Sequence, residues 1–239
     1  MTSALGGFLE GESGDITFPI LVFVVEHPVG VVVLDTGLHP QLARTTERLG
    51  KCATMFQVHL PADGSGALGP VLRGAGFDPA EVGQVVLTHL HFDHAGGLVD
   101  LPNARVVVQR REWADRRNDG LVRIGAYNPA DFELGHDRLE LEGDHDLFGD
   151  GAVVCLLTDG HTAGHQSVRV RTGAGVYVVC GDCCYLRRTL TDKHLPPFGD
   201  RARQLASLRR LEEEQSAGAT LLFGHDPDQW STIERTGLS

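Results

Sequence analysis

Four side chains that can bind a metal ion fall within one stretch of six residues. They are His89, His91, Asp93 and His94. At the end of a strand, residues two apart point the same way, so His89 and His91 can present their imidazoles to one ion. Asp93 and His94 then turn toward a second ion. Neutral imidazole and carboxylate groups suit zinc and its neighbouring divalent ions.

Three later segments place another ligand-type residue after a glycine at the end of an apolar run. They are Gly160-His161, Gly181-Asp182 and Gly224-His225. Glycine permits a tight turn and a close backbone approach at such points. A histidine-rich surface loop would explain the first segment alone. Four strand ends that each carry His or Asp instead imply that these side chains converge on one edge of the sheets.

The strands that position these residues are short apolar runs rich in β-branched residues. We expect strands at Ile20–Val25, Val31–Leu34, Val85–Leu87, Val106–Val108, Val153–Leu157, Val168–Val170, Val176–Val179 and Leu221–Phe223. Their nearly continuous apolarity indicates sheets that are covered on their outer faces. Helices would supply that cover. We expect them at Pro40–Leu49, Ala67–Gly74, Arg111–Asp119 and Arg201–Gln215, the last with Gly218 as its stop.

Strands and helices are interspersed from end to end, and no Pro/Ser-rich linker or charge block divides the chain. We therefore expect a single domain over residues 1–239. The least patterned part runs from Asn118 to Asp150 and is rich in Gly, Asp and Glu. A lid or substrate rim is one interpretation of this segment. A solvated connection with several short turns is the other.

The composition argues against nucleic acid and membrane as partners. A formal net charge of −11 at pH 7 repels phosphate backbones at long range, so a neutral or weakly charged small molecule fits better. The segment from Met1 to Ile20 has no basic region and no long apolar run. We therefore expect no signal peptide, no transmembrane helix and a cytoplasmic location.

The five cysteines show no spacing typical of a disulfide framework, so we expect reduced thiols. Cys180-x-x-Cys183 matches a redox or zinc motif, but Asp182 lies inside it. We interpret Cys183 and Cys184 as small buried thiols beside the metal site. A thiolate from either one as an extra ligand stays open.

Taken in order, these segments resemble the metal-binding signature of the metallo-β-lactamase superfamily. The matching segments are Leu34-Asp35-Thr36-Gly37, His89-x-His91-x-Asp93-His94, Gly160-His161, Gly181-Asp182 and Gly224-His225, which span nearly the whole chain. The resemblance implies an α/β fold, the four-layer αβ/βα sandwich of that superfamily. It also implies two metal ions. One would be held by His89, His91 and His161, the other by Asp93, His94 and His225, with Asp182 as a bridge.

Within the superfamily, the chain resembles the N-acyl-homoserine lactone lactonases. The residues that carry this resemblance are Leu90 to Gly97, Gly160 to Ser167, Tyr185 three positions after Asp182, and Phe223 to Asp226. The chain departs from that pattern at Asp159 and Ala163, where the family usually has proline. This changes the stiffness of the loop and leaves the ligands intact. The arm before Phe18 is also short, which bears on the dimer contact and the acyl-chain pocket.

The resemblance and the residues together suggest roles for side chains near the metals. Tyr185 would donate a hydrogen bond to the substrate carbonyl, although a plain core aromatic is the alternative. Asp93 would carry a proton to the leaving alkoxide. Asp35 would orient a metal-bound histidine, or else serve only as a turn residue. His165 would form a supporting hydrogen bond.

Two neighbouring divalent ions lower the pKa of a shared water, so a bridging hydroxide is available at neutral pH. We expect this hydroxide to open a lactone ring, that of an N-acyl-homoserine lactone above all. A metal-dependent hydrolase of other esters or phosphotriesters is the alternative, and a non-catalytic metal-binding protein is a third interpretation. Zinc is the default metal, but cobalt, manganese or iron accept the same ligands. The resemblance suggests a homodimer, which the composition does not decide.

Overall fold

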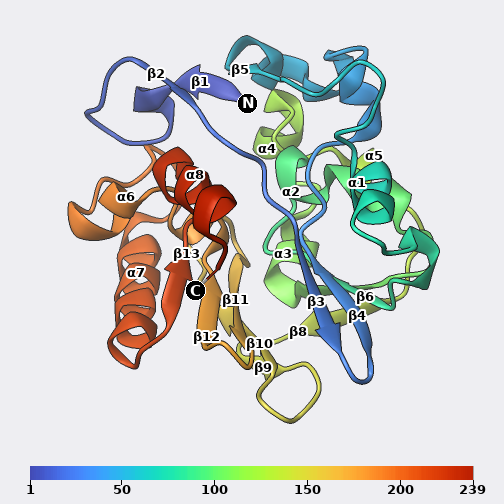
Figure 1. Cartoon of the computed structure of the whole chain (residues 1–239). Helices are drawn as coiled ribbons and strands as arrows, with labels where there is room; N and C mark the ends of the chain where they lie inside the picture. Colours follow the sequence, from blue (N-terminus) through green and yellow to red (C-terminus); the bar gives the residue numbers. More distant parts are fainter. Residues whose placement is uncertain (239) are drawn as a thin grey trace. The chain divides into compact units, whose positions relative to one another are not determined.

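The structure is a computed structural model that describes residues 1–238, and it divides into two compact units. The first unit consists of Met1–Ser3 and Ile20–Glu140. The second consists of Ala4–Pro19 and the chain from Leu141 onward. Each unit has its own β-sheet and helices (Figure 1). The single domain expected over residues 1–239 stays a prediction.

The first unit is built on a five-stranded sheet in the order β3-β4-β6-β7-β8. β3 (Phe23–His27) and β4 (Gly30–Leu34) form an antiparallel hairpin, whereas β4, β6 (Gln84–Val86) and β7 (Arg105–Gln109) run parallel. β8 (Arg138–Leu141) forms the far edge. Because parallel strands end at the same edge of a sheet, the segments that follow β4, β6 and β7 lie side by side.

Short helices and one large apolar cluster complete the first unit. The α-helices are α1 (Leu68–Gly74), α2 (Phe92–Ala95), α3 (Arg110–Asp115), α4 (Asp119–Ile124) and α5 (Pro129–Phe132). The 3-10 helices are η2 (Pro40–Ala43), η3 (Glu47–Thr54), η4 (Pro79–Glu81) and η5 (Gly96–Asp100). A small strand, β5 (Phe56–Gln57), pairs with β1 (Thr2–Ala4). The core includes Val85, Leu87, Leu98, Val106, Val108 and Trp113.

The second unit is built on another five-stranded sheet, in the order β13-β12-β11-β10-β9. Its strands are β9 (His145–Asp146), β10 (Val153–Leu157), β11 (Gln166–Arg171), β12 (Val176–Val179) and β13 (Thr220–Leu222). Neighbours from β9 to β12 are antiparallel, whereas β13 is parallel to β12, with Val179 opposite Leu222. The carboxyl ends of β12 and β13 are therefore adjacent.

Helix α7 (Arg201–Ser216) covers this second sheet beside β13 (Figure 1). Asp200 caps its start by accepting the backbone N–H of Arg203 at 3.1 Å. Leu208 and Leu211 are buried on one side of this helix. They belong to the same apolar cluster as Val178 and Phe223 of the sheet. The remaining elements of the unit are β2 (Asp15–Thr17), η1 (Leu5–Gly7), η6 (Gly181–Cys183), α6 (Arg187–Thr191) and α8 (Pro227–Thr236).

Every strand expected from the sequence has a counterpart, and three other expectations are corrected. A helix over Pro40–Leu49 is wrong: the segment forms 3-10 turns that break at the β-branched pair Thr45-Thr46. The helix over Arg111–Asp119 is two helices, because Asn118 caps α4 by accepting the N–H of Gly120 at 3.0 Å. The stretch from Asn118 to Asp150 contains α4, α5, β8 and β9, so it is more ordered than expected. Within residues 1–238, no helix is long and apolar enough to cross a membrane.

Candidate functional site

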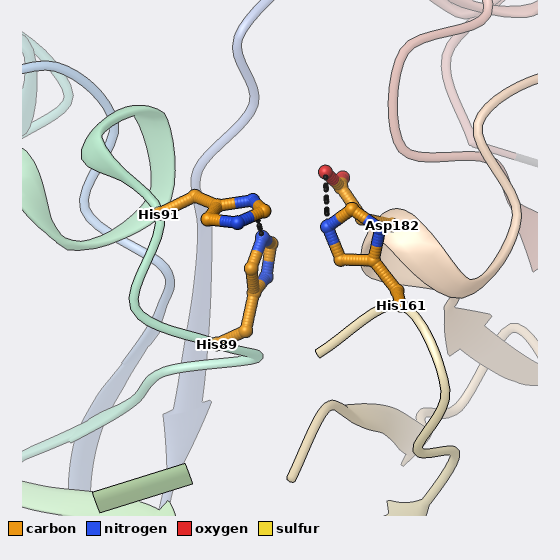
Figure 2. A group of neighbouring side chains, drawn as sticks. All are labelled: His89, His91, His161 and Asp182. Atoms are coloured by element: carbon orange, nitrogen blue, oxygen red, sulfur yellow. Dashed lines mark hydrogen bonds and ion pairs between the residues drawn. The ribbon is translucent and has the colours of Figure 1, made fainter. Parts of the chain in front are cut away.

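The first ligand pair lies at the end of β6, in the first unit. His89 is fully buried and His91 is 8% exposed. Nε2 of His89 lies 2.9 Å from Nδ1 of His91. A dashed line in Figure 2 marks this contact. Two nitrogens bound to one zinc ion at about 2.0–2.1 Å are about 3 Å apart, so these rings are spaced as ligands of a single ion. Asp93 and His94 lie in α2, and Oδ2 of Asp93 is 3.9 Å from Nε2 of His94.

A buried aspartate orients His94. Asp35, which follows β4 with a left-handed φ of 56°, accepts the Nδ1–H of His94 at 2.8 Å. It also accepts the backbone N–H of Thr88 at 2.7 Å and its hydroxyl at 2.9 Å. The Thr88 oxygen is in turn 3.0 Å from Nδ1 of His89. The contact expected between Asp35 and a ligand-type histidine is therefore present.

The glycines after His94 let two backbone segments pack closely. A side chain at Gly96 would place its Cβ 3.0 Å from the carbonyl oxygen of Gly37, and one at Gly97 would overlap the carbonyl oxygen of Thr36. The carbonyl of His94 accepts both the N–H and the hydroxyl of Thr36, each at 2.7 Å. The start of α2 is thus fixed to the turn after β4.

A buried pair that the sequence analysis missed supports the same loop. Glu112 is fully buried in α3 and accepts the backbone N–H of Leu90, between the two ligand histidines, at 2.9 Å. Tyr127 donates its hydroxyl to the same carboxylate oxygen at 2.5 Å, and its ring centroid lies 5.4 Å from that of His91. Glu112 follows the end of β7, so the rule that polar residues gather at strand ends could have found it.

In the second unit, the ligand-type residues come from three strand ends. His161 follows β10, Asp182 follows β12 and His225 follows β13. Gly224 has no room for a side chain, because a Cβ there would lie 2.6 Å from the carbonyl oxygen of Gly181. The close approach of these two glycines brings the ends of β12 and β13 together.

Asp182 faces two histidines with its two oxygens. Oδ2 lies 3.3 Å from Nε2 of His161, and Oδ1 lies 3.1 Å from Nε2 of His225. Figure 2 shows the His161–Asp182 pair. All three side chains are at least 96% buried. A carboxylate that offers one oxygen on each side has the arrangement of a bridging ligand.

The N-terminal arm packs against His225 and Tyr185 within the second unit. The carbonyl of Pro19 accepts the Nδ1–H of His225 at 2.9 Å. Phe8 lies 4.9 Å from Tyr185 between ring centroids, and Phe18 lies 5.0 Å from His225. The Tyr185 hydroxyl is 3.4 Å from Nδ1 of His161. The expected role of Tyr185 toward a substrate stays a prediction. The contacts of Phe8 and Pro19 left no readable signal in the sequence.

His165 makes the supporting contacts expected of it. Its Nε2 accepts the backbone N–H groups of Asp182 at 3.0 Å and of Cys183 at 3.2 Å, while its Nδ1 lies 3.1 Å from the carbonyl oxygen of Thr158. A proton on Nδ1 satisfies all of these partners. This neutral, fully buried ring therefore fixes the turn that carries Asp182.

The cysteines are all free and buried, in agreement with the expectation of small buried thiols. Burial raises the pKa of Cys183 to about 12, and it raises the pKa values of Cys180 and Cys184 well above their usual range. Since the thiolate is the nucleophile and the metal ligand, these thiols are poor candidates for either role at neutral pH.

The donor set fits divalent metal ions. His89, His94 and His225 each have Nδ1 bonded to an oxygen of the protein, which leaves Nε2 as the lone-pair donor. Buried imidazoles and carboxylates without thiolates favour zinc and similar ions. A nearby cation also offsets the cost of burying the carboxylates of Asp93 and Asp182.

Sequence comparison identifies the family. The profile of the Metallo-beta-lactamase superfamily matches residues 16–225. The chain belongs to this superfamily. Among its relatives is the N-acyl homoserine lactonase AttM of Azorhizobium caulinodans, which is 31% identical over 238 residues, covering 95% of this chain and 89% of the relative.

Solved structures show the same fold. One is an N-acyl homoserine lactone hydrolase with the product N-hexanoyl-L-homoserine bound at its catalytic metal center. It has a TM-score of 0.82 and 24% identity, over 97% of this chain and 91% of that one. Another is AidC, a dizinc quorum-quenching lactonase, with a TM-score of 0.64 and 18% identity, over 89% of this chain and 74% of that one. The comparisons confirm the predicted family, the α/β fold class and the prediction of a metal-dependent hydrolase.

Proposed function

We propose that this protein is a lactonase that opens the ring of N-acyl homoserine lactones at a dinuclear metal centre. The observation that carries the proposal is the position of Asp182 between His161 and His225, one oxygen toward each ring. A carboxylate placed in this way suits a pair of ions rather than a single one. The reaction and substrate class follow those named for its relatives.

The proposed centre uses the seven ligand-type residues that the sequence predicts. His89, His91 and His161 would hold one ion, Asp93, His94 and His225 would hold the other, and Asp182 would bridge them. Zinc is the proposed metal, because the donors are imidazole and carboxylate and because the relative AidC is a dizinc enzyme. The ring contacts of Asp35 and Pro19 fix two of these histidines in the tautomer that a metal requires.

When bound, such ions make a hydroxide nucleophile available at neutral pH and polarise the lactone carbonyl. Residues of the chain would transfer the proton and stabilise the developing negative charge. The Tyr185 hydroxyl would donate a hydrogen bond to the carbonyl oxygen as it gains negative charge, and removal of one such donor typically costs about 3 kcal/mol in the barrier. Asp93 would take up the proton of the attacking hydroxide and deliver it to the ring oxygen when the carbon–oxygen bond breaks. The product is the ring-opened N-acyl homoserine.

A substrate comparison with purified, zinc-reconstituted protein tests this proposal. We would follow acid release in a pH-stat with N-hexanoyl homoserine lactone, an aryl ester and a paraoxon-like phosphotriester. The expected result is a kcat/KM for the lactone that exceeds the other two by orders of magnitude. A phosphotriester or aryl ester that is preferred by such a margin would contradict the lactonase assignment. No turnover of any of them, with metal bound, would indicate a non-catalytic protein.

Replacement of the bridging carboxylate sharpens the test. Asp182→Asn keeps the size of the side chain but removes its charge, so we expect lactone turnover to fall by at least about 100-fold and the second metal to be lost. Asp144→Asn is the matched control in the same unit, because Asp144 pairs with Arg210 at the surface. Its activity and metal content should stay at the wild-type level.

A further inference from the structure

An exposed aromatic ring lies beside His161, one of the two histidines of the second unit that are predicted to bind metal. Phe198 is 44% exposed, and its ring centroid is 5.4 Å from that of His161, with the two planes tilted by 59°. Within residues 1–238, the other large apolar side chains that are exposed are aliphatic or Met, and Phe198 alone is aromatic. Isolated exposed apolar residues are common on protein surfaces. One that contacts a metal-ligand ring needs a more specific explanation.

The backbone around Phe198 is tightly attached to the His161 loop. The carbonyl of Phe198 accepts the side-chain amide of Gln204 at 2.6 Å, and the same amide lies 3.3 Å from the carbonyl oxygen of Gly160. The N–H of Asp200 donates to that Gly160 carbonyl at 2.7 Å. These bonds fix the Phe198 backbone relative to His161, although the ring itself stays exposed.

The residue after Phe198 must be glycine for this attachment to form. Gly199 has a left-handed φ of 82°, and a Cβ there would overlap the Gly160 carbonyl oxygen and lie 3.0 Å from that of His161. Gln204, which links the two segments, is 3% exposed. The local sequence therefore maintains a close contact that holds the Phe198 backbone beside the His161 loop.

An apolar ring next to a reacting centre offers a surface to the apolar part of a substrate. Each methylene of the substrate that is buried against such a ring increases the affinity. A phenylalanine ring has few rotatable bonds, so it loses little conformational entropy when it is covered. His161 directs Nε2 toward Asp182 and has Phe198 beside its ring. A carbonyl bound at His161 and Asp182 would then have its neighbouring carbon atoms within reach of Phe198.

We propose that Phe198 is a specificity-determining residue that packs against the acyl group of the substrate. This inference rests on the proposed lactonase function. It adds that Phe198 increases the affinity for substrates with a long apolar acyl chain. It makes Phe198 a contact for substrate, with no role in the chemical step. Truncation of its ring should therefore affect substrates in proportion to their apolar length.

The test compares wild type, Phe198→Ala and Phe198→Leu, each reconstituted with zinc. Kinetic constants would be measured for γ-butyrolactone, which has no acyl chain, and for N-butanoyl, N-hexanoyl and N-decanoyl homoserine lactone. For Phe198→Ala we expect less than about a twofold change in kcat/KM for γ-butyrolactone and about a tenfold loss for the decanoyl substrate, mainly through KM. Phe198→Leu should recover part of that loss.

A binding measurement without turnover gives a second readout. The Kd of the ring-opened product N-decanoyl homoserine, measured by calorimetry, should rise about tenfold in Phe198→Ala, with the metal content unchanged. Leu134→Ala is the matched control, because Leu134 is an apolar side chain of similar exposure, 41%, and belongs to the first unit. It should leave all of these constants unchanged.

The outcomes separate this inference from the proposed function. If wild type turns over the lactones but Phe198→Ala loses activity equally on every substrate, Phe198 only supports His161 and the inference is wrong. An unchanged chain-length profile in Phe198→Ala overturns it as well. If wild type opens no lactone at all, the proposed function itself fails.

Discussion

The two units hold their ligand-type residues by different means. In the first unit the ligand-type residues follow one strand end, and polar side chains hold them: Asp35 accepts the Nδ1–H of His94, and Glu112 accepts the N–H of Leu90, between His89 and His91. In the second unit the ligand-type residues follow three strand ends, and backbone groups hold them: the carbonyl of Pro19 accepts the Nδ1–H of His225, and Gly224 packs against the carbonyl oxygen of Gly181. We therefore expect the first unit to be sensitive to the loss of a polar side chain and the second to any change in backbone packing.

The largest effect is expected from Gly224→Ala in the second unit. The new methyl group would lie 2.6 Å from the Gly181 carbonyl oxygen and 3.3 Å from Oδ1 of Asp182, so the strand ends must separate. A misplacement of about 1 Å can cost about 100-fold in rate, and overpacking costs about 1–3 kcal/mol of stability. Lactone kinetics and urea unfolding would measure both. Gly173→Ala, with no heavy atom near the added methyl, is the control and should change neither. If the two variants have the same kinetics and the same stability, the second unit does not depend on this backbone contact.

In the first unit, Asp35→Asn should weaken metal binding by about 10- to 100-fold. Asparagine tolerates the left-handed φ of this position, so the backbone is kept while the charged acceptor for His94 is lost. Competition with a chromogenic chelator would measure the affinity. Asp78→Asn alters an exposed cap at Ala80 and should leave the affinity unchanged. An affinity for Asp35→Asn equal to that of wild type would show that side-chain orientation is unimportant in this unit.

A smaller effect is expected at His165, where two substitutions distinguish shape from hydrogen bonding. His165→Leu leaves the N–H groups of Asp182 and Cys183 without their acceptor, at about 1–3 kcal/mol for each buried group. His165→Gln keeps an acceptor oxygen and should retain more of the unfolding free energy and of the metal affinity. Denaturant unfolding of the two apo-proteins would show the ranking. If Leu and Gln are equally disruptive, the contacts to the turn do not position Asp182.

The smallest effect concerns the thiols of the second unit. Since burial raises the pKa of Cys155 and of Cys183 to about 12, alkylation of the native protein at pH 8 should be slow and should speed up as the pH rises toward that value. Mass spectrometry after iodoacetamide treatment would count the modified residues. The urea-unfolded chain serves as the control and should be alkylated at all five cysteines. Fast labelling of the native protein would mean that the cysteines are accessible, contrary to the fold.

Sequence patterns pointed to the ligand-type residues because each one follows the end of a strand within a few positions. The rule that ligand-type residues gather at strand ends needs only the apolar run and the next few residues, as at Val85–Leu87 and His89. The same rule could have pointed to Glu112 beyond β7. It could not find Phe8 or Pro19, whose partners are more than 160 positions away in the chain. Contacts between such distant residues depend on packing, which leaves no local pattern.

The wrong helix over Pro40–Leu49 has a similar cause. The side chain of His39 caps the first turn by accepting the N–H of Gln41 at 3.1 Å, but the turns break at Thr45 and Thr46, and Arg48 pairs with the buried Asp131, 83 positions away. Tertiary contacts of this kind override a weak helical propensity. The well-patterned α7 is correctly predicted, since its buried stripe and its cap at Asp200 lie within the segment itself.

The most direct measurement is the number of metal ions bound per chain. Protein reconstituted with excess zinc and freed of loosely bound metal would be analysed by inductively coupled plasma mass spectrometry, beside Asp182→Asn. Two equivalents in the wild type, with loss of at least one in the variant, is the result that a bridging Asp182 predicts. A wild-type value of one equivalent or less, or an unaltered value in the variant, would contradict the dinuclear centre.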